Sequence, residues 1–167
     1  LEDIGAKTVW VDSGYKAVEA VSKSLQEDWM FDIAMIDWKM PGIDGIETAR
    51  RIRRLVGPDT MIIIITAYNW TVIEAEAREA GVDSFITKPL FRSVLYDTFT
   101  ELEKKRLNQK QPGQNLSPDA APAGIMPDQL PLADFHILLV EDNMLNQEIA
   151  KTLLEMNGAK VDVAENG

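Results

Sequence analysis

The sequence of 167 residues contains no cysteine and a single histidine. Without cysteine, neither a disulfide framework nor a thiolate metal site is possible, and a reducing compartment is the simplest expectation. Basic residues are also scarce, because 17 Lys and Arg stand against 27 Asp and Glu, for a formal net charge of -10. Nucleic acids and anionic membrane surfaces attract clustered Lys and Arg, so this balance argues against direct contact with either.

Long apolar runs are missing as well. The longest one, residues 61–65, is far shorter than the roughly 20 apolar residues that a helix needs to cross a bilayer. The hydrophobic content of 46% is nevertheless sufficient for a folded core. We therefore expect a globular protein that makes no direct membrane contact through these residues.

The most informative stretch is FDIAMIDWKMPGIDG, residues 31–45. Its apolar run ends on Asp37 and is followed by a Pro-Gly turn. Four consecutive apolar residues, 33–36, predict a short strand buried on both faces of a parallel sheet. Parallel sheets carry their chemistry at the carboxyl ends of strands, so we expect Asp37 at the functional edge. Asp44 is interpreted as a helix N-cap rather than a ligand.

Strands and helices alternate along the chain. Strands are predicted at residues 7–11, 33–37, 61–65, 83–87, 135–140 and 160–164. Helices are predicted at residues 15–27, 44–55, 72–80, 91–107 and 144–158, the last with Asn143 as its N-cap. The second helix carries an apolar stripe at Ile46, Ala49, Ile52 and Leu55. This alternation predicts an α/β fold with a doubly wound parallel sheet.

Two features indicate that one repeat ends and a homologous one begins within the chain. Residues 1–14, LEDIGAKTVWVDSG, align without gaps on residues 154–167, LEMNGAKVDVAENG, with six identities. Residues 108–133 hold five of the eight prolines and predict a semi-extended linker. We therefore expect a window of a longer polypeptide, with one unit at residues 1–107 and the start of another at residues 134–167.

Polar residues follow the predicted strands. Asp37, Thr66 and Lys88 end three of them, and the acid pair Glu141 and Asp142 follows a fourth. Attack of a carboxylate on phosphorus needs mainly positioning and charge neutralisation. An acid pair and an Asp can hold a hard divalent cation such as Mg²⁺, while a Lys and a hydroxyl bind the remaining phosphoryl oxygens. The product of such a site is an aspartyl phosphate.

Each of these residues also has an ordinary structural interpretation. A single Asp after a strand is often a turn or cap residue, a Thr at a strand end often bonds backbone, and a Lys is usually a solvated charge. Asp37, Thr66 and Lys88 in register at three strand ends favour a functional site. His136 falls within a predicted strand, and we expect a structural role for it.

Together these motifs resemble the receiver (response-regulator) domain family, in tandem, as in hybrid sensor histidine kinases. The matching motifs are the acid pair after a first strand, ID-x-x-MPG-x-DG around Asp37, TA at residues 66–67 and KP at residues 88–89. The resemblance implies a flavodoxin-like fold with a five-stranded parallel sheet. It also implies cytoplasmic phosphorelay signalling, in a parent chain that is itself either free or anchored to a membrane.

The resemblance further implies roles for individual residues. Asp37 is the phosphoacceptor, Thr66 and Phe85 act as the switch, and the Lys39 backbone carbonyl joins the acidic residues around Mg²⁺ or Mn²⁺. The Lys88–Pro89 bond is commonly cis in the family. The phosphoryl donor is a histidine kinase or a histidine phosphotransfer domain, and the fragment is a phosphoacceptor domain rather than a turnover enzyme. Lys39 and Tyr68 flank the acyl phosphate, so we hypothesise that they slow its hydrolysis.

No single repeat holds a complete site, since the acid pair serving Asp37 would precede residue 1. We hypothesise that residues 135–142 fill the vacant central position beside Asp37, which gives a truncated and circularly permuted receiver. A flexible linker of this length reaches roughly 25–30 Å, which permits the arrangement. Residues 160–164 would then duplicate an occupied edge strand and pair elsewhere, which favours dimers through unpaired strands.

Three other functions fit parts of the pattern. A pseudoreceiver would fold alike without phosphorylation and act through the face built on Phe85 and residues 91–107. The missing acid pair favours that function, whereas the retained phosphoacceptor, Thr and Lys argue against it. A phosphatase of the haloacid dehalogenase type needs an acid two residues after the nucleophile, where Lys39 stands. A flavodoxin-like cofactor carrier needs a phosphate-binding loop of Gly, Ser and Thr, which follows none of these strands.

Overall fold

The computed structural model describes residues 7–67, 71, 73–91, 93–95, 97–98, 100–101, 135–156 and 160–163. The predicted linker at residues 108–133 and Tyr68 lie outside the described residues, as does the C-terminal part of the helix predicted at residues 91–107. Within the described ranges, no helix combines the length and apolar character that crossing a membrane requires.

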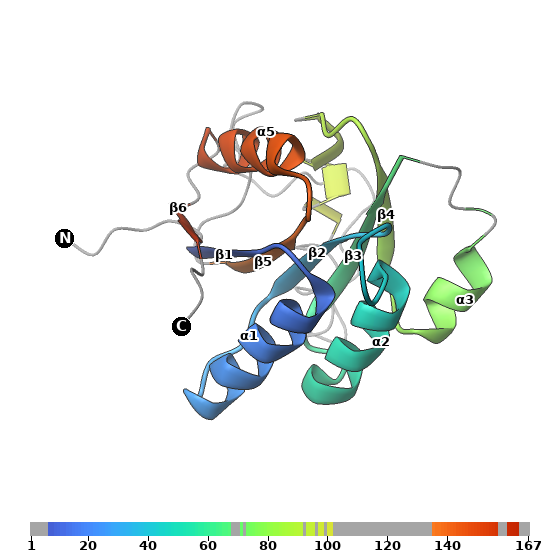
Figure 1. Ribbon diagram of the computed structural model, residues 1–167, viewed down its shortest axis with the longest axis vertical. Helices are drawn as coiled ribbons and strands as arrows, with labels where there is room; N and C mark the ends of the chain where they lie inside the picture. Colours follow the sequence, from blue (N-terminus) through green and yellow to red (C-terminus); the bar gives the residue numbers. More distant parts are fainter. Residues whose placement is uncertain are drawn as a thin grey trace, which may run out of the picture.

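In the described part of the chain, six strands form one parallel sheet. They are β1 (Lys7–Val11), β2 (Ile33–Asp37), β3 (Met61–Thr66), β4 (Ser84–Thr87), β5 (His136–Val140) and β6 (Lys160–Val163). Their spatial order is β4-β3-β2-β5-β1-β6 (Figure 1). Counting β5 as the first strand turns five of them into the order 2-1-3-4-5 of flavodoxin-like sheets. The predicted doubly wound parallel fold is therefore confirmed, with β6 as an additional edge strand.

Helices cover both faces of this sheet. They are α1 (Gly14–Gln26), α2 (Gly45–Val56), α3 (Glu74–Glu79) and α5 (Met144–Glu155), and the described residues between 93 and 101 are helical as well. Figure 1 shows α1 and α2 on one face and α5 on the other. The Asp44 carboxylate accepts the Glu47 N–H at 2.8 Å, and Asn143 Oδ1 accepts the Leu145 N–H at 2.9 Å. Both predicted N-caps are therefore confirmed.

Alternate residues of the central strands face two separate cores. Toward α1 and α2 point Ala34, Ile36, Ile62, Ile64, Leu138 and Val140. Toward α5 point Ile33, Met35, Ile63, Ile65, Ile137 and Leu139. Because both faces are covered, these strands are apolar at consecutive positions rather than at every second one.

Strand β5 occupies the central position that the sequence predicts for it. It pairs with β2 through Ile33↔Ile137 and with β1 through Lys7↔His136. A gap there would leave the facing backbone N–H and C=O groups of two strands unpaired inside the protein. Burial of the four apolar residues 137–140 adds about 1.5–3 kcal/mol for each side chain. The hypothesis that residues 135–142 complete the sheet within one chain is confirmed.

Two predictions are wrong. Residues 160–163 do not pair elsewhere, because β6 pairs with the outer edge of β1 in the same chain, with Lys160 opposite Lys7. Leu55 does not face the core either: it is 43% exposed, and Val56 is buried in its place. The last step of the α2 stripe is four residues instead of three, as a period of 3.6 residues requires.

Candidate functional site

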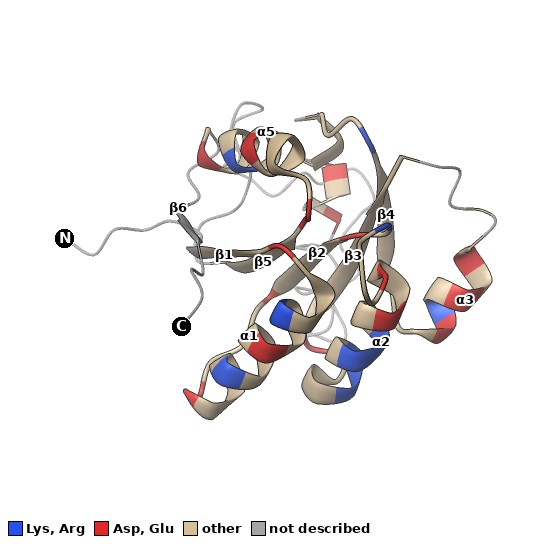
Figure 2. Cartoon of the chain, viewed as in Figure 1, with Lys and Arg blue, Asp and Glu red and all other residues tan. Residues whose placement is uncertain are grey.

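The carboxyl ends of four adjacent strands bring the predicted site residues to one edge of the sheet. Asp37 is the last residue of β2, and Glu141 follows β5 directly. The two strands are in register up to Ile36↔Val140, so these acids are adjacent on neighbouring strands. Thr66 ends β3, and Lys88 follows β4. Figure 2 shows the resulting accumulation of acidic residues where these strands end.

Three carboxylates converge at this edge. One carboxylate oxygen each from Asp37, Glu141 and Asp142 lies within 4.8 Å of the others. Asp37 is 7% exposed and Glu141 only 3%, so two of the three charges are largely removed from water. Buried carboxylates at such short separation repel one another and require cations beside them.

Lys88 supplies one such cation. Its Nζ lies 3.0 Å from Asp37 Oδ1 and 2.7 Å from Glu141 Oε2. The Lys88 backbone N–H donates to the Thr66 carbonyl at 2.8 Å, which extends the pairing of β4 with β3 by one residue. The Lys88–Pro89 peptide bond is cis, as predicted. One lysine thus connects the two acids that come from opposite ends of the chain.

The ionisation of these groups reflects their surroundings. Burial raises the pKa of Asp37 and Glu141 adds to the rise, while the hydrogen bond from Lys88 opposes it without cancelling it. Burial also lowers the pKa of Lys88, but hydrogen bonds to Glu141 and Asp37 outweigh that effect and leave the pKa above its usual value. Lys88 therefore stays protonated at neutral pH, and it places one positive charge beside three carboxyl groups.

Glu141 is held in place from both sides. Its Oε2 accepts from Lys88, and its Oε1 accepts from Asn146 Nδ2 at 3.0 Å. The side chain of Gln147 donates to the Glu141 backbone carbonyl at 2.8 Å. Both amides lie in the first turn of α5. The positioning roles of Asn146 and Gln147 were not predicted from the sequence. The pattern that could have indicated them is the pair of amide side chains shortly after the acid pair and the N-cap Asn143.

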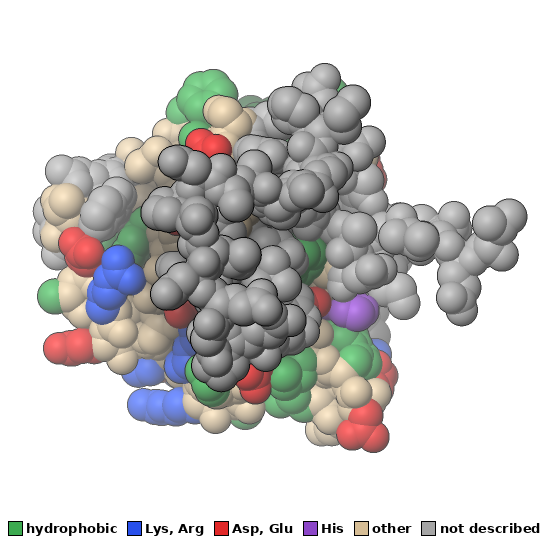
Figure 3. Space-filling view, turned by 180° about the vertical axis from the view of Figure 1, so that it is seen from behind, with side chains coloured by type: hydrophobic (Ala, Val, Ile, Leu, Met, Phe, Trp, Pro, Cys, Tyr) green, Lys and Arg blue, Asp and Glu red, His purple; other side chains and the backbone are tan. Residues whose placement is uncertain are grey.

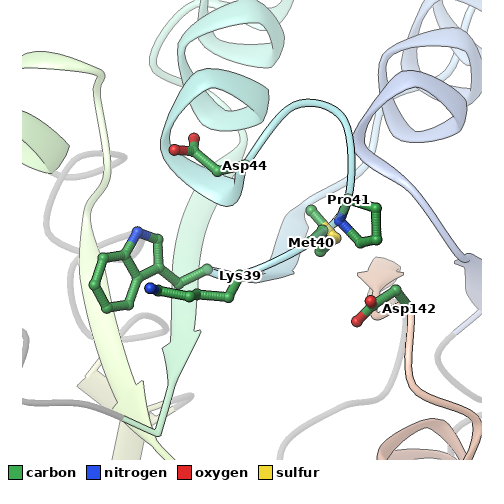
Figure 4. A pocket seen from close by; sticks show the side chains of 6 residues that line it. Lys39, Met40, Pro41, Asp44 and Asp142 are labelled. Atoms are coloured by element: carbon green, nitrogen blue, oxygen red, sulfur yellow. The ribbon is translucent and has the colours of Figure 1, made fainter.

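The loop between β2 and α2 forms one wall of a pocket of about 560 Å³. Its lining consists of Trp38, Lys39, Met40, Pro41, Asp44 and Asp142. Figure 4 shows the Asp142 side chain below the loop that carries Met40 and Pro41. Lys39, whose carbonyl was predicted to bind metal, lies in this wall, and its Nζ is 5.0 Å from the centre of the Trp38 ring. Among the described lining residues of this pocket, Asp142 comes from the C-terminal segment and the others come from the loop between β2 and α2.

Two glycines explain the sequence of this loop. A Cβ on Gly45 would lie 2.4 Å from the Asp37 carbonyl oxygen, so only glycine lets α2 begin against the end of β2. The Gly45 N–H donates to the Trp38 carbonyl at 2.8 Å, which fixes this approach. Gly42 has a φ of 85°, a conformation that residues with a Cβ rarely adopt. The MPG-x-DG pattern therefore has a local geometric cause.

The two predicted switch residues lie on the neighbouring strands. Thr66 is 1% exposed and lies one residue beyond Ile65, which is aligned with Asp37. Phe85 is partly buried in β4 against the core on the α1 and α2 face, and the Arg78 guanidinium lies 5.8 Å from its ring centre. Thr66 thus ends β3 and Phe85 lies within β4, two successive strands on one side of β2.

The donor set fits a hard divalent cation. Mg²⁺ and Mn²⁺ prefer carboxylate, carbonyl and water oxygens, and three carboxylates with the loop carbonyls provide only oxygen. Thiolate and imidazole ligands are absent from this group of residues. On the face turned away in Figure 1, the visible described side chains mix acidic, basic and apolar groups (Figure 3). The cluster of Asp37, Glu141 and Asp142 has the oxygen ligands that a hard divalent cation prefers.

Comparison with known proteins points to one family. Residues 1–100, more than half of the chain, match the response regulator receiver domain. The sensor histidine kinase GacS of Pseudomonas protegens is 34% identical over 94 residues, which cover 54% of this chain and 10% of that protein. The transcriptional regulatory protein ResD of Bacillus subtilis is 37% identical over 79 residues, or 47% of this chain and 31% of ResD.

Solved structures include a similar domain. The REC domain of AraT, a response regulator from Geobacillus stearothermophilus, is 18% identical with a TM-score of 0.48, covering 65% of this chain and 99% of that one. The chain spans between a tenth and a third of the length of the two curated relatives named above.

Proposed function

Because this chain belongs to the response regulator receiver domain family, we propose that Asp37 accepts a phosphoryl group from a phosphohistidine. The donor is a histidine kinase or a histidine phosphotransfer domain. One observation carries the proposal: the carboxylates of Asp37, Glu141 and Asp142 converge, with Lys88 bridging two of them. This set provides a nucleophile, an acid pair and a fixed positive charge at one edge of the sheet.

The proposed transfer step uses the side chains at this edge of the sheet. A carboxylate oxygen of Asp37 forms a bond to phosphorus while the phosphorus–nitrogen bond breaks, and the electron pair of that bond returns to the imidazole of the donor. The protein contributes mainly positioning and charge neutralisation to such a reaction. Lys88 is 3.0 Å from Asp37 and stays protonated, so it can bind an oxygen of the transferred group. Thr66 would bind another with its hydroxyl.

The acid pair has the second role. Asp37, Glu141, Asp142 and the Lys39 carbonyl would hold Mg²⁺, or Mn²⁺ in its place. A bound divalent cation neutralises negative charge on the carboxylates and on the incoming phosphoryl oxygens. Glu141 is oriented by Lys88 and by the first turn of α5, whereas Asp142 lines the open pocket.

We further propose that residues 1–107 belong to one receiver domain, residues 108–133 to a linker and residues 134–167 to the start of a second receiver. The parent chain is then a hybrid sensor histidine kinase. Two features support this view: the repeat of residues 1–14 at residues 154–167, and the similarity to a small part of a sensor histidine kinase.

Phosphorylation would be transmitted through Thr66 and Phe85 to the surface near β4. The lifetime of the phosphoryl group would depend on Lys39, which lines the pocket beside Asp142. We retain the hypothesis that Lys39 and Tyr68 slow attack by water. Replacing both with small polar residues should speed dephosphorylation, and an unchanged rate would contradict this part of the proposal.

The proposed reaction is tested by incubating the chain with acetyl phosphate, with and without Mg²⁺, and measuring intact mass followed by peptide mapping. We expect one phosphoryl adduct on Asp37 that requires Mg²⁺ and is absent from the Asp37→Asn variant. The Thr66→Ala variant should fold and still form the adduct, because the Thr66 hydroxyl is proposed to bind a phosphoryl oxygen and not to accept the phosphoryl group. No adduct in the folded wild-type chain would instead indicate a pseudoreceiver.

A further inference from the structure

Strands β1 and β6 are related in sequence and lie next to each other in the sheet. They pair in parallel, with Lys7 opposite Lys160, Thr8 opposite Val161 and Trp10 opposite Val163. The ungapped alignment of residues 1–14 on residues 154–167 equates these same positions. The sheet thus contains two versions of one strand, placed in the same register at successive positions.

The connectivity of β6 does not match its position. Strand β5, helix α5 and strand β6 form a strand–helix–strand unit, and in the order 2-1-3-4-5 the strand after such a helix pairs directly with the first strand. Here β1 lies between β5 and β6. Strand β1 therefore holds the position that the chain from α5 would ordinarily reach.

We propose that β1 and β6 are alternative occupants of the position beside β5. In the observed order, β1 holds it and β6 lies at the edge. In the exchanged order, β4-β3-β2-β5-β6, strand β6 pairs with β5 and β1 leaves it. The proposal concerns a conformational device in the fold and does not depend on whether Asp37 is phosphorylated.

Two buried polar atoms lower the stability of β1 in its observed position. Thr8 Oγ1 and Trp10 Nε1 are buried and have no hydrogen-bond partner among the residues that the structure describes. Such groups cost free energy in the folded state and recover their hydrogen bonds when the strand is released to water. The aligned residues of β6, Val161 and Val163, have no polar side-chain atoms to satisfy. At these two positions the sequence of β6 is the better match for a covered strand.

Other features favour the observed order. Strand β1 pairs with a neighbour on both sides, and only two residues separate it from α1. The α1 residues Ala17 and Val21 are fully buried against the sheet, which tethers β1 nearby. Asp162 would also take the position of the apolar Val9. Features of both kinds are expected for two occupants of similar stability.

The exchange would leave the strands that carry the site residues in place, but it would change the strand that pairs with the outer side of β5. The strands that carry Asp37, Lys88 and the acid pair keep their neighbours among β2, β3, β4 and β5. The Glu141 N–H, however, donates to the Val11 carbonyl at 3.1 Å, and this acceptor leaves with β1. Release of β1 also frees the chain that leads into α1 at Ser13. The occupant of this position thus links the acid pair to the N-terminal segment.

Engineered cysteines can distinguish the two orders, since the chain has no cysteine of its own. In the observed order Lys7 is opposite both His136 and Lys160, whereas His136 and Lys160 are two strand spacings apart. Two spacings are roughly 9.5 Å, beyond the about 7 Å between Cα atoms that a disulfide can bridge. The K7C/H136C pair reports the observed order, and the H136C/K160C pair reports the exchanged order.

The decisive variant carries all three cysteines, K7C/H136C/K160C, in a thiol redox buffer that allows links to rearrange. We expect both the 7–136 and the 136–160 links within one chain. Adding Val9→Pro, which disfavours β1 in a paired position, should raise the ratio of the 136–160 link to the 7–136 link at least tenfold. K7C/K160C is the control for pairing of β1 with β6, and circular dichroism verifies folding.

Two outcomes would overturn the proposal. In the first, the 7–136 and 7–160 links form but the 136–160 link does not, even with Val9→Pro, so that β6 only covers the edge of β1. In the second, the 136–160 link forms only between two chains, which intact mass under non-reducing conditions detects as a dimer.

Discussion

The two ends of the sheet both concentrate charged residues, but they balance them differently. At the amino end, Asp83 and Arg53 form a one-to-one pair within a network of backbone contacts. At the carboxyl end, three carboxylates lie close together and Lys88 pairs with two of them, Asp37 and Glu141. The first arrangement satisfies its own charges, whereas the second keeps an excess of negative charge.

The Arg53 guanidinium connects two loops at the amino end, the one between α2 and β3 and the one between α3 and β4. It donates to the backbone carbonyls of Gly57, Thr60 and Gly81 and pairs with the Asp83 carboxylate. Asp83 Oδ2 in turn accepts the Ile62 N–H at 2.8 Å. Each strong donor here has an acceptor of the same protein, which is the pattern of a structural network.

Asp32 joins three strands at the same end. Its carboxylate accepts the His136 backbone N–H at 2.8 Å, and its own carbonyl accepts the Met61 N–H at 2.8 Å. The His136 ring lies 5.2 Å from the Trp29 ring. These contacts fix the start of β5 and agree with the structural role predicted for the histidine.

The paired charges at the amino end stabilise the fold, whereas the excess of carboxylates at the carboxyl end can bind a ligand. A matched pair makes the protein more stable and leaves nothing for a ligand. An excess of buried carboxylate destabilises the protein until a cation or a proton compensates it. Removing a charge should therefore have opposite effects on stability at the two ends.

The largest effect is expected at the amino end. Arg53→Met removes the hydrogen bonds of the guanidinium to all four of its partner residues and should lower the free energy of unfolding by about 2–3 kcal/mol, because several acceptors lose their partner. Urea denaturation measures the change. Arg54→Met on the exposed side of the same helix is the matched control, with an expected change below about 0.5 kcal/mol. Equal destabilisation by the two variants would contradict the structural role of Arg53.

At the carboxyl end, removing the charge of Asp37 should raise the free energy of unfolding, by less than the loss of Arg53 lowers it. Burial and Glu141 raise the pKa of Asp37 above its ordinary 3.8, so the folded state holds this proton more tightly than the unfolded state. The stabilising contribution of Asp37 is therefore complete below its unfolded pKa and is lost as the pH rises through the higher folded pKa. Asp37→Asn lacks this loss and should be more stable than wild type at neutral pH without metal.

Bound Mg²⁺ should reduce the difference in the free energy of unfolding between the wild type and Asp37→Asn. Mg²⁺ at ten times its Kd would stabilise the wild type by about 1.4 kcal/mol and the Asp37→Asn variant by less. Urea denaturation between pH 4 and 8, with and without Mg²⁺, provides the measurement. A variant less stable than wild type at pH 7 without metal would show that Lys88 balances the cluster after all.

Much of the fold and the site follows from local patterns in the sequence. Continuous apolar runs identify covered strands, and the residue after each run identifies the edge where Asp37, Lys88 and Glu141 meet. The central place of β5 follows from the vacancy that the other strands leave. Local patterns are sufficient for the central strands because both faces of each are buried, and the vacancy beside β2 is apparent from the resemblance to the receiver fold.

Contacts between distant residues could not be predicted in the same way. Arg53 and Asp83 are 30 residues apart and belong to no motif, so only the folded structure reveals their network. The pairing of β6 with β1 was also missed, because any free strand edge can accept another strand. The exposed Leu55 shows that the last turn of a helix is poorly determined by its apolar stripe.

The function proposed for Asp37 requires that the acid pair after β5 completes its site. The direct measurement is the rate of Mg²⁺-dependent phosphorylation of Asp37 by acetyl phosphate in Asp142→Asn, compared with Asp12→Asn. Both acids follow neighbouring strands at the same end, but Asp12 pairs with Lys16 at 2.9 Å. We predict a decrease of at least tenfold for Asp142→Asn and less than twofold for Asp12→Asn. Phosphorylation of Asp142→Asn at the wild-type rate would contradict the account.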